Sequence, residues 1–200
     1  MSVDAEKHLK MTQKRQAGHE KKKAKATKEK GLLIVNTGTG KGKSSAAFGM
    51  AVRGVGHGMK VGVVQFIKGA MHTAERDVLS KFDNCEWHTI GDGFTWNTQN
   101  REQDVATAEK AWAEAARMID DRDYDMIVLD ELNVVLKYDY LDSASVLEKL
   151  QSRGDMQHVI VTGRHASDEL IEAADLVSEI RPIKHPFKEQ GVKAQRGIEF

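Results

Sequence analysis

The residues whose types and spacing best suit chemistry lie directly after a short apolar run. Residues 32–35 read LLIV, and residues 37–45 read TGTGKGKSS. Three glycines at alternate positions let the backbone curl so that several N–H groups point at one anion. A helix that starts at the end of this stretch adds the positive end of its dipole. The sequence therefore predicts a phosphate-binding loop made of Thr37, Gly38, Thr39, Gly40, Lys41, Gly42, Lys43, Ser44 and Ser45.

Two side chains of this loop suit a nucleotide with its metal ion. Lys43 is placed to reach phosphate oxygens, and the Ser44 hydroxyl is placed to ligate Mg²⁺ or Mn²⁺. The usual pattern has a glycine five positions before the glycine of the GKS triplet, where this chain has Thr37. The glycines are shifted by one position, and Lys41 is an additional cation. We expect a nucleoside triphosphate in this loop, and the direction in which it lies stays open.

Two other apolar runs end in polar residues that suit the same site. Asp130 and Glu131 follow the run at 126–129, and Arg164 follows the run at 159–161. Because the carboxyl ends of parallel strands meet at one edge of a sheet, these side chains are expected beside the phosphate loop. We expect Glu131, or its neighbour Asp130, to hold the metal ion together with Ser44. Arg164 is either a bidentate phosphate clamp or a surface residue that caps a turn. The catalytic roles are assigned to Lys43, Glu131 and Arg164.

Several short apolar runs predict the strands that must position these residues. They lie at 32–35, 61–66, 126–129 and 159–161, and residues 176–177 start another. Continuous apolar strands are typical of a parallel sheet that is covered on both faces. Trp87 is expected in the core, on a further strand.

Helical patterns separate the apolar runs. They occupy residues 44–55 and 101–120, and Asn100, Asp142 and Ser167 are the expected N-caps of three helices. We predict a three-layer α/β domain, in which a parallel sheet carries helices on both faces, with the P-loop NTPase (RecA-like) architecture.

Charge divides the chain into two parts. Residues 1–30 contain ten Lys/Arg and four Asp/Glu, a net charge of +6, and residues 31–200 carry a net charge of −6. We expect residues 1–30 to form a basic, mobile arm that is able to become helical when it docks. Residues 31–200 are expected to form the nucleotide-binding domain.

The composition excludes several classes of protein. The longest apolar runs have four residues, so a membrane-spanning helix is not expected, and the Lys-rich start lacks the apolar block of a secretory signal. Cys85 is the only cysteine, which excludes an internal disulfide and fits the reducing cytoplasm. No aromatic residues alternate with the lysines of the arm and the body is acidic, so nucleic acid is not an expected partner.

Further segments carry a resemblance to a known family. They are residues 37–69, 91–104 (with GFTW at 93–96), 125–133, 138–141, 159–187 (with RPIKH at 181–185) and 191–200. Together they resemble the ATP:corrinoid adenosyltransferases of the cobalamin pathway, which act on cob(I)alamin or cob(I)yrinic acid a,c-diamide, in their phosphate-loop type. Thr37 in place of the usual glycine is what the loop of this family shows.

The resemblance implies a specific reaction. The 5′-deoxyadenosyl group of ATP is transferred to the cobalt(I) of a reduced corrinoid, and inorganic triphosphate is released. Because cobalt is the nucleophile, no Ser, Cys or His nucleophile is required. The motifs alone leave a RecA-like ATPase or a small-molecule kinase as alternatives.

The resemblance also implies residues and partners for the corrinoid. Phe94 and Trp96 are implied to exclude the lower ligand from cobalt, and His185 is implied to border the corrinoid. On the residues alone, the two aromatic rings suit either a wall for a flat ring system or anchors that pack a loop. A homodimer and a flavoprotein reductant are implied as well.

Overall fold

The computed structural model describes residues 3–67, 73–90 and 100–199, and the chain divides into two compact units, Met1–Lys30 and Gly31–Phe200. The first unit contains α1 (Val3–Lys25), a helix of 23 residues whose described side chains are exposed. Its Ala, Lys and Glu residues have high helix propensity. The segment is helical in the structure, and its role as a basic, mobile arm stays a prediction.

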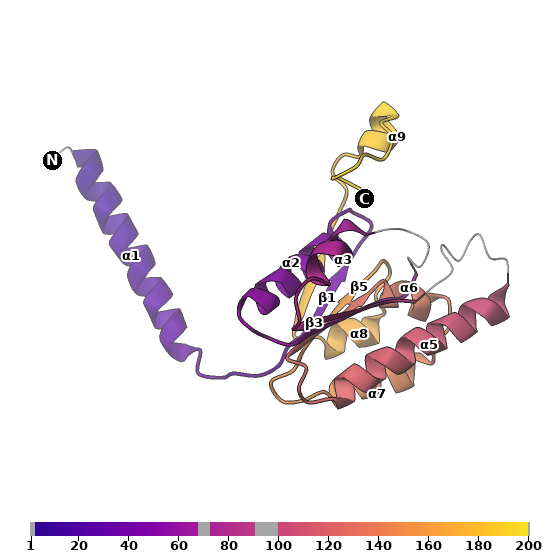
Figure 1. Ribbon diagram of the computed structural model, residues 1–200. Coiled ribbons are helices and arrows are strands. Elements are labelled where there is room, and N and C mark those ends of the chain that lie inside the picture. Colours follow the sequence, from indigo (N-terminus) through magenta and orange to yellow (C-terminus); the bar gives the residue numbers. More distant parts are fainter. Residues whose placement is uncertain (1–2, 68–72, 91–99, 200) are drawn as a thin grey trace. The chain divides into compact units, whose positions relative to one another are not determined.

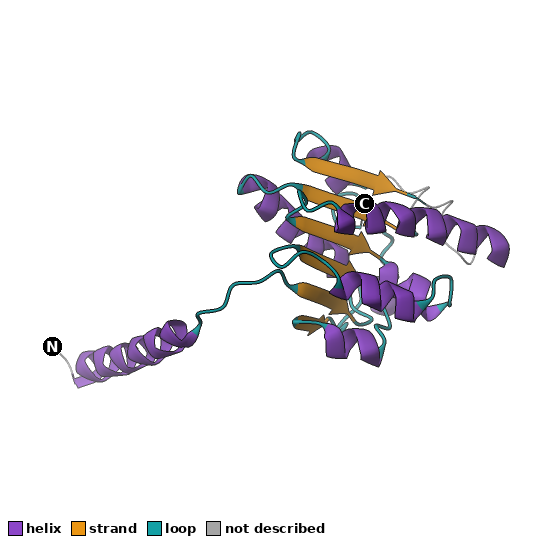
Figure 2. Ribbon diagram, turned by 90° about the horizontal axis from the view of Figure 1, so that it is seen from below, coloured by secondary structure: helices purple, strands orange, loops and turns teal. Residues whose placement is uncertain are grey.

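The second unit is built on a six-stranded sheet with the order β3-β2-β4-β5-β1-β6. The strands are β1 (Leu33–Thr37), β2 (Val61–Gln65), β3 (Cys85–Thr89), β4 (Met126–Asp130), β5 (His158–Thr162) and β6 (Leu176–Glu179). Each neighbouring pair is parallel, and the arrows in Figure 2 point the same way. All their carboxyl ends therefore lie at one edge of the sheet.

Helices cover both faces of this sheet (Figure 1). In the described residues of the second unit, the helices are α2 (Lys43–Gly56), α3 (Ala74–Leu79), α5 (Arg101–Asp120), α6 (Leu132–Lys137), α7 (Ser143–Gln151), α8 (Asp168–Ala173) and α9 (Pro186–Gln190). Buried side chains of α2 and α3 pack on one face, and those of α5, α6, α7 and α8 pack on the other. The predicted three-layer α/β architecture is confirmed.

Alternation along the central strands explains this layering. In β1, Leu33 and Val35 belong to the core cluster under α5, whereas Ile34 belongs to the cluster under α2. Successive side chains of a strand point to opposite faces, so a strand covered on both sides must be apolar throughout. The runs that predict β1, β4 and β5 have this property, and the run of β2 has it except at Gln65.

The predicted helix starts are also confirmed. The side chains of Asn100, Asp142 and Ser167 each accept a hydrogen bond from a backbone N–H in the first turn of α5, α7 and α8. None of the helices in the described part of the chain is both long enough and apolar enough to cross a membrane.

Candidate active site

The glycine-rich loop joins the end of β1 to the start of α2 and is packed against the chain that follows β6. The Gly40 N–H donates to the Ile180 carbonyl oxygen at 2.7 Å, and the Ile180 N–H donates to the Thr37 carbonyl oxygen at 2.9 Å. A Cβ on Gly38 would lie 2.4 Å from the Ile180 oxygen, and one on Gly40 would lie 2.8 Å from it. Gly38 also has a φ of 98°. Both positions therefore require glycine.

Thr37 shows why the first glycine of this loop is shifted. It is the last residue of β1, and its hydroxyl accepts a hydrogen bond from the Ala166 N–H at 3.2 Å. The chain still has strand geometry here, and it turns only at Gly38. A side chain is therefore accommodated at residue 37 and ties β1 to the loop that follows β5.

A cavity of about 340 Å³ opens at this loop. It gathers loop residues with one residue after β4 and one after β5, and among the predicted site residues its lining contains Gly40, Lys41, Gly42, Lys43, Ser44, Ser45, Glu131 and Arg164. Three cations, three hydroxyls and three carboxylates from distant parts of the chain thus line one space; the carboxylates are those of Glu75, Glu131 and Glu199. A hydroxyl and a carboxylate are oxygen donors of the kind that Mg²⁺ prefers.

The cations of the cavity differ in their surroundings. Lys43 is 6% exposed, and its ammonium group donates to the Gly40 carbonyl oxygen at 2.7 Å. Arg164 is exposed. Lys41 is also exposed and forms an ion pair with Glu199, which lines the same cavity. The buried lysine is thus held inside the loop, while Lys41 and Arg164 lie at its surface.

The two acidic residues at the end of β4 have different positions. Asp130 is fully buried and accepts hydrogen bonds from the Thr162 hydroxyl at 2.8 Å and from the Gln65 side-chain amide at 3.0 Å. It does not line the cavity, whereas Glu131 does. Glu131 has a φ of 66°, and its N–H donates to the Thr162 hydroxyl oxygen at 3.0 Å. Thr162 therefore joins the buried carboxylate to the residue that faces the cavity.

Sequence reasoning gave no role to Gln65, Thr162 or Glu199. Gln65 is a polar residue at the end of an apolar strand and is fully buried, and its side-chain oxygen also accepts from the Trp87 indole N–H at 3.2 Å. The signal in the sequence that could have identified Gln65 is its position as a polar residue at the end of an apolar run. Glu199 had no such signal, because it lies 158 residues from Lys41.

Of the residues predicted for the corrinoid, His185 alone belongs to the described part of the chain. Phe94 and Trp96 lie outside the described residues. His185 is half-buried just before α9, and its Nδ1 atom is buried without a hydrogen-bond partner among the described residues. It does not line the cavity at the loop.

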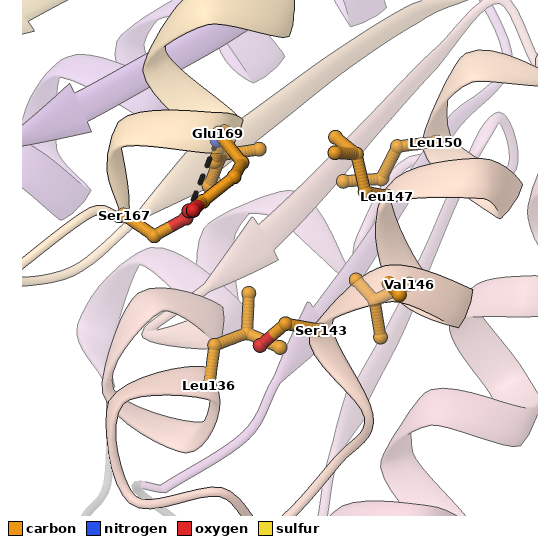
Figure 3. Close-up of a pocket in the computed structure, with 9 residues that line it drawn as sticks. Leu136, Ser143, Val146, Leu147, Leu150, Ser167 and Glu169 are labelled. Carbon is orange, nitrogen blue, oxygen red and sulfur yellow. Dashed lines mark hydrogen bonds between the residues drawn. The ribbon is translucent and has the colours of Figure 1, made fainter.

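A second cavity of about 340 Å³ lies between α6, α7 and α8 (Figure 3). Its lining is mainly aliphatic, including Leu136, Val146, Leu147 and Leu150, and it includes no Lys or Arg among the described residues. A polyphosphate needs cations and N–H donors, so the cavity at the loop is the one that suits a nucleotide.

A polar cluster of residues from β3, α5 and the turn between α5 and β4 lies outside both cavities. The side chains of Tyr124 and Arg117 donate hydrogen bonds to Glu86, and His88 lies 2.7 Å from it. Partial burial acts to raise the pKa of Glu86, but these partners outweigh it and lower the pKa to about 2. With Arg117 already paired to Glu86, this cluster is a structural ion-pair network.

The sequence matches the family model of ATP:corrinoid adenosyltransferase BtuR/CobO/CobP over residues 29–200. The chain belongs to the ATP:corrinoid adenosyltransferase family. This adenosyltransferase is 54% identical over 200 residues to the corrinoid adenosyltransferase of Sinorhizobium sp, with 98% of this chain and 92% of the relative covered. It is 50% identical over 196 residues to that of Pseudomonas aeruginosa, with 98% and 96% covered.

Family membership confirms the resemblance that the motifs predicted. The adenosyltransferase is therefore a transferase with ATP and a corrinoid as substrates, and this reaction is favoured over a RecA-like ATPase or a kinase. Among solved structures, the flagellar accessory protein FlaH from Methanocaldococcus jannaschii is similar, with a TM-score of 0.52, 11% sequence identity, and 76% of this chain and 71% of that chain covered. At this identity the likeness concerns the fold alone.

Proposed function

We propose that the loop cavity binds ATP with Mg²⁺ or Mn²⁺ and directs its 5′-carbon toward the cobalt(I) of a reduced corrinoid. In the step, cobalt(I) supplies the electron pair of the new cobalt–carbon bond, the C5′–O bond breaks, and its electrons leave with inorganic triphosphate. The observation that carries this proposal is the cavity itself, where three cations meet the Ser44 hydroxyl and the Glu131 carboxylate at the end of a phosphate loop.

The role of the protein cations follows from the leaving group. Negative charge increases on the triphosphate as the C5′–O bond breaks, and fixed cations that face this charge lower the barrier. Lys43, held in the loop, and Arg164, at the surface of the cavity, are assigned this catalytic role. The N-terminal end of α2, a helix of 14 residues, adds a positive dipole at the same place.

Glu131 and Ser44 are the proposed metal ligands. Both line the cavity, and their oxygen donors suit Mg²⁺. When bound, the ion supplies further neutralisation of the triphosphate. Asp130, also a predicted ligand, is proposed instead to support Glu131 through Thr162, because both of its carboxylate oxygens accept buried hydrogen bonds.

The corrinoid side of the site rests on family resemblance. Phe94 and Trp96 are proposed to exclude the lower ligand from cobalt, which makes cobalt(II) easier to reduce, and His185 is proposed to border the corrinoid. The partly buried His185, with Nδ1 unpartnered among the described residues, supports a ligand on that side. A homodimer, a flavoprotein reductant and a cytoplasmic location are proposed on the same resemblance, and the single cysteine supports the last.

The experiment is to mix the protein with ATP, Mg²⁺ and chemically reduced cob(I)alamin and to follow the absorbance change of adenosylation. Inorganic triphosphate is the expected second product. Lys43→Ala is expected to abolish detectable turnover, since one buried cation and its hydrogen bonds disappear together. Release of ADP and phosphate, or near-normal activity of a folded Lys43→Ala protein, would refute the proposal.

A further inference from the structure

The carboxyl-terminal segment contributes an anion to the nucleotide cavity. Gly197, Ile198 and Glu199 line the cavity, and the Glu199 carboxylate forms an ion pair with Lys41 of the phosphate loop. A turn holds this segment in shape, because the N–H groups of Ile198 and Glu199 both donate to the Gln195 carbonyl oxygen, at 3.1 and 2.9 Å. Gly197 supplies the left-handed residue of this turn, with a φ of 79°.

An anion at this place opposes the binding of a polyphosphate. The Glu199 carboxylate neutralises the Lys41 ammonium group, so a phosphate oxygen that binds Lys41 competes with Glu199 for this positive charge. The carboxylate also repels the bound polyphosphate, because both are negative and they share one cavity. In other ion pairs of the described surface, such as Lys149 with Asp120, the acid lies away from this cavity.

We infer that Glu199 weakens the triphosphate site by pairing with Lys41 and competing with the polyphosphate for its positive charge. Binding of ATP displaces Glu199 from Lys41, and the return of Glu199 to Lys41 favours release of the triphosphate product. This inference rests on the proposed binding of ATP at the loop.

The expected size of the effect follows from the exposure of the pair. The Lys41 side chain is 55% exposed and the Glu199 side chain 21% exposed. An ion pair this exposed changes an equilibrium by about two- to fivefold, and the lost repulsion acts in the same direction. We therefore expect Glu199→Gln to bind triphosphate about three- to tenfold more tightly than the unmodified chain.

The test measures binding of inorganic triphosphate and of ATP, each with Mg²⁺, by titration calorimetry. Four full-length proteins form a double-mutant cycle: the unmodified chain, Glu199→Gln, Lys41→Met and the double variant. Glu148→Gln is the matched control, because it removes the same charge from an exposed residue of α7 that does not line the cavity. Melting temperatures establish that all five proteins are folded.

Glu199→Gln is expected to tighten both ligands by the same factor and to lower the inhibition constant of triphosphate in turnover. In the Lys41→Met background the same substitution is expected to have a clearly smaller effect. An unchanged or weakened triphosphate affinity in Glu199→Gln would overturn the inference. So would weaker binding of ATP alone, because it would assign Glu199 to the nucleoside. Failure of the unmodified chain to bind either ligand would overturn the proposed function itself.

Discussion

Thr162→Val tests whether buried side chains of the sheet position the Glu131 carboxylate in the cavity at the loop. Thr162 is fully buried at the end of β5, and its hydroxyl donates to Asp130 and accepts from the Glu131 N–H. Valine has nearly the same shape without the hydroxyl. The substitution therefore removes both hydrogen bonds and leaves the packing volume almost unchanged.

The expected loss of stability follows from these two contacts. A hydrogen bond to a buried carboxylate contributes about 1.5–3 kcal/mol, and a buried N–H that loses its acceptor costs about 1–3 kcal/mol. Glu131 also has a left-handed backbone, which costs roughly 1 kcal/mol or more and persists only where its surroundings hold it. Since contributions at neighbouring sites do not add fully, we expect Thr162→Val to lower the free energy of unfolding by about 2–4 kcal/mol.

Urea unfolding measures this loss of stability. The Mg²⁺ concentration for half-maximal adenosylation of preformed cob(I)alamin reports whether Glu131 is still correctly placed. We expect that concentration to rise about three- to tenfold, since a shift of about 1 kcal/mol changes an equilibrium roughly fivefold. Thr162→Ser is the control: it keeps the hydroxyl and is expected to retain the Mg²⁺ requirement despite losing a buried methyl group. Equal Mg²⁺ requirements in the Val and Ser variants would refute the reasoning.

Three further predictions concern the carboxylates, the aromatic loop and acid stability. Glu131→Gln is expected to raise the Mg²⁺ requirement with little loss of stability, whereas Asp130→Asn is expected mainly to destabilise the fold; the reverse pattern in the same two assays would exchange their roles. Phe94→Ala and Trp96→Ala are expected to lose most activity from cob(II)alamin with a mild reductant and to keep a substantial share from preformed cob(I)alamin; equal losses with a lower melting temperature would make both rings packing residues. The lowered pKa of Glu86 stabilises the folded state above about pH 4.5, and this contribution is lost as the pH falls toward about 2. Glu86→Gln should therefore flatten the pH dependence of the free energy of unfolding between about pH 5 and 2, as measured by urea unfolding.

The central strands could be predicted because each contains a continuous run of apolar residues, which indicates burial on both faces. The apolar runs of β1, β2, β4 and β5 are covered on both faces, and such runs are typical of the strands of parallel sheets. The outer strands lack this signal. The residues of β3 are only half-buried, and those of β6 are exposed, so neither needs a continuous apolar run.

Site residues that follow the ends of strands could be predicted from the sequence. Contacts that depend on the register between strands could not. The loop and the residue after β4 follow strand ends, so their meeting at one edge of the sheet follows from the fold class. The link from Gln65 to Asp130 depends on their being paired residues of β2 and β4. A sequence specifies neither this register nor the turn that brings Glu199 to Lys41.

The shifted glycine of the phosphate loop is a local feature of the sequence whose cause is a contact with a distant part of the chain. Thr37, Gly38 and Gly40 all approach Ile180, through two backbone hydrogen bonds and two close contacts that exclude a Cβ. The loop therefore has its shape because the chain after β6 passes over it, and the same chain continues within five residues to His185. This attachment places the loop proposed to hold the triphosphate close along the chain to the segment proposed to border the corrinoid. Transfer between two bound substrates requires a fixed distance between them, because an error of about 1 Å in the approach of the reacting atoms lowers a rate by roughly a hundredfold.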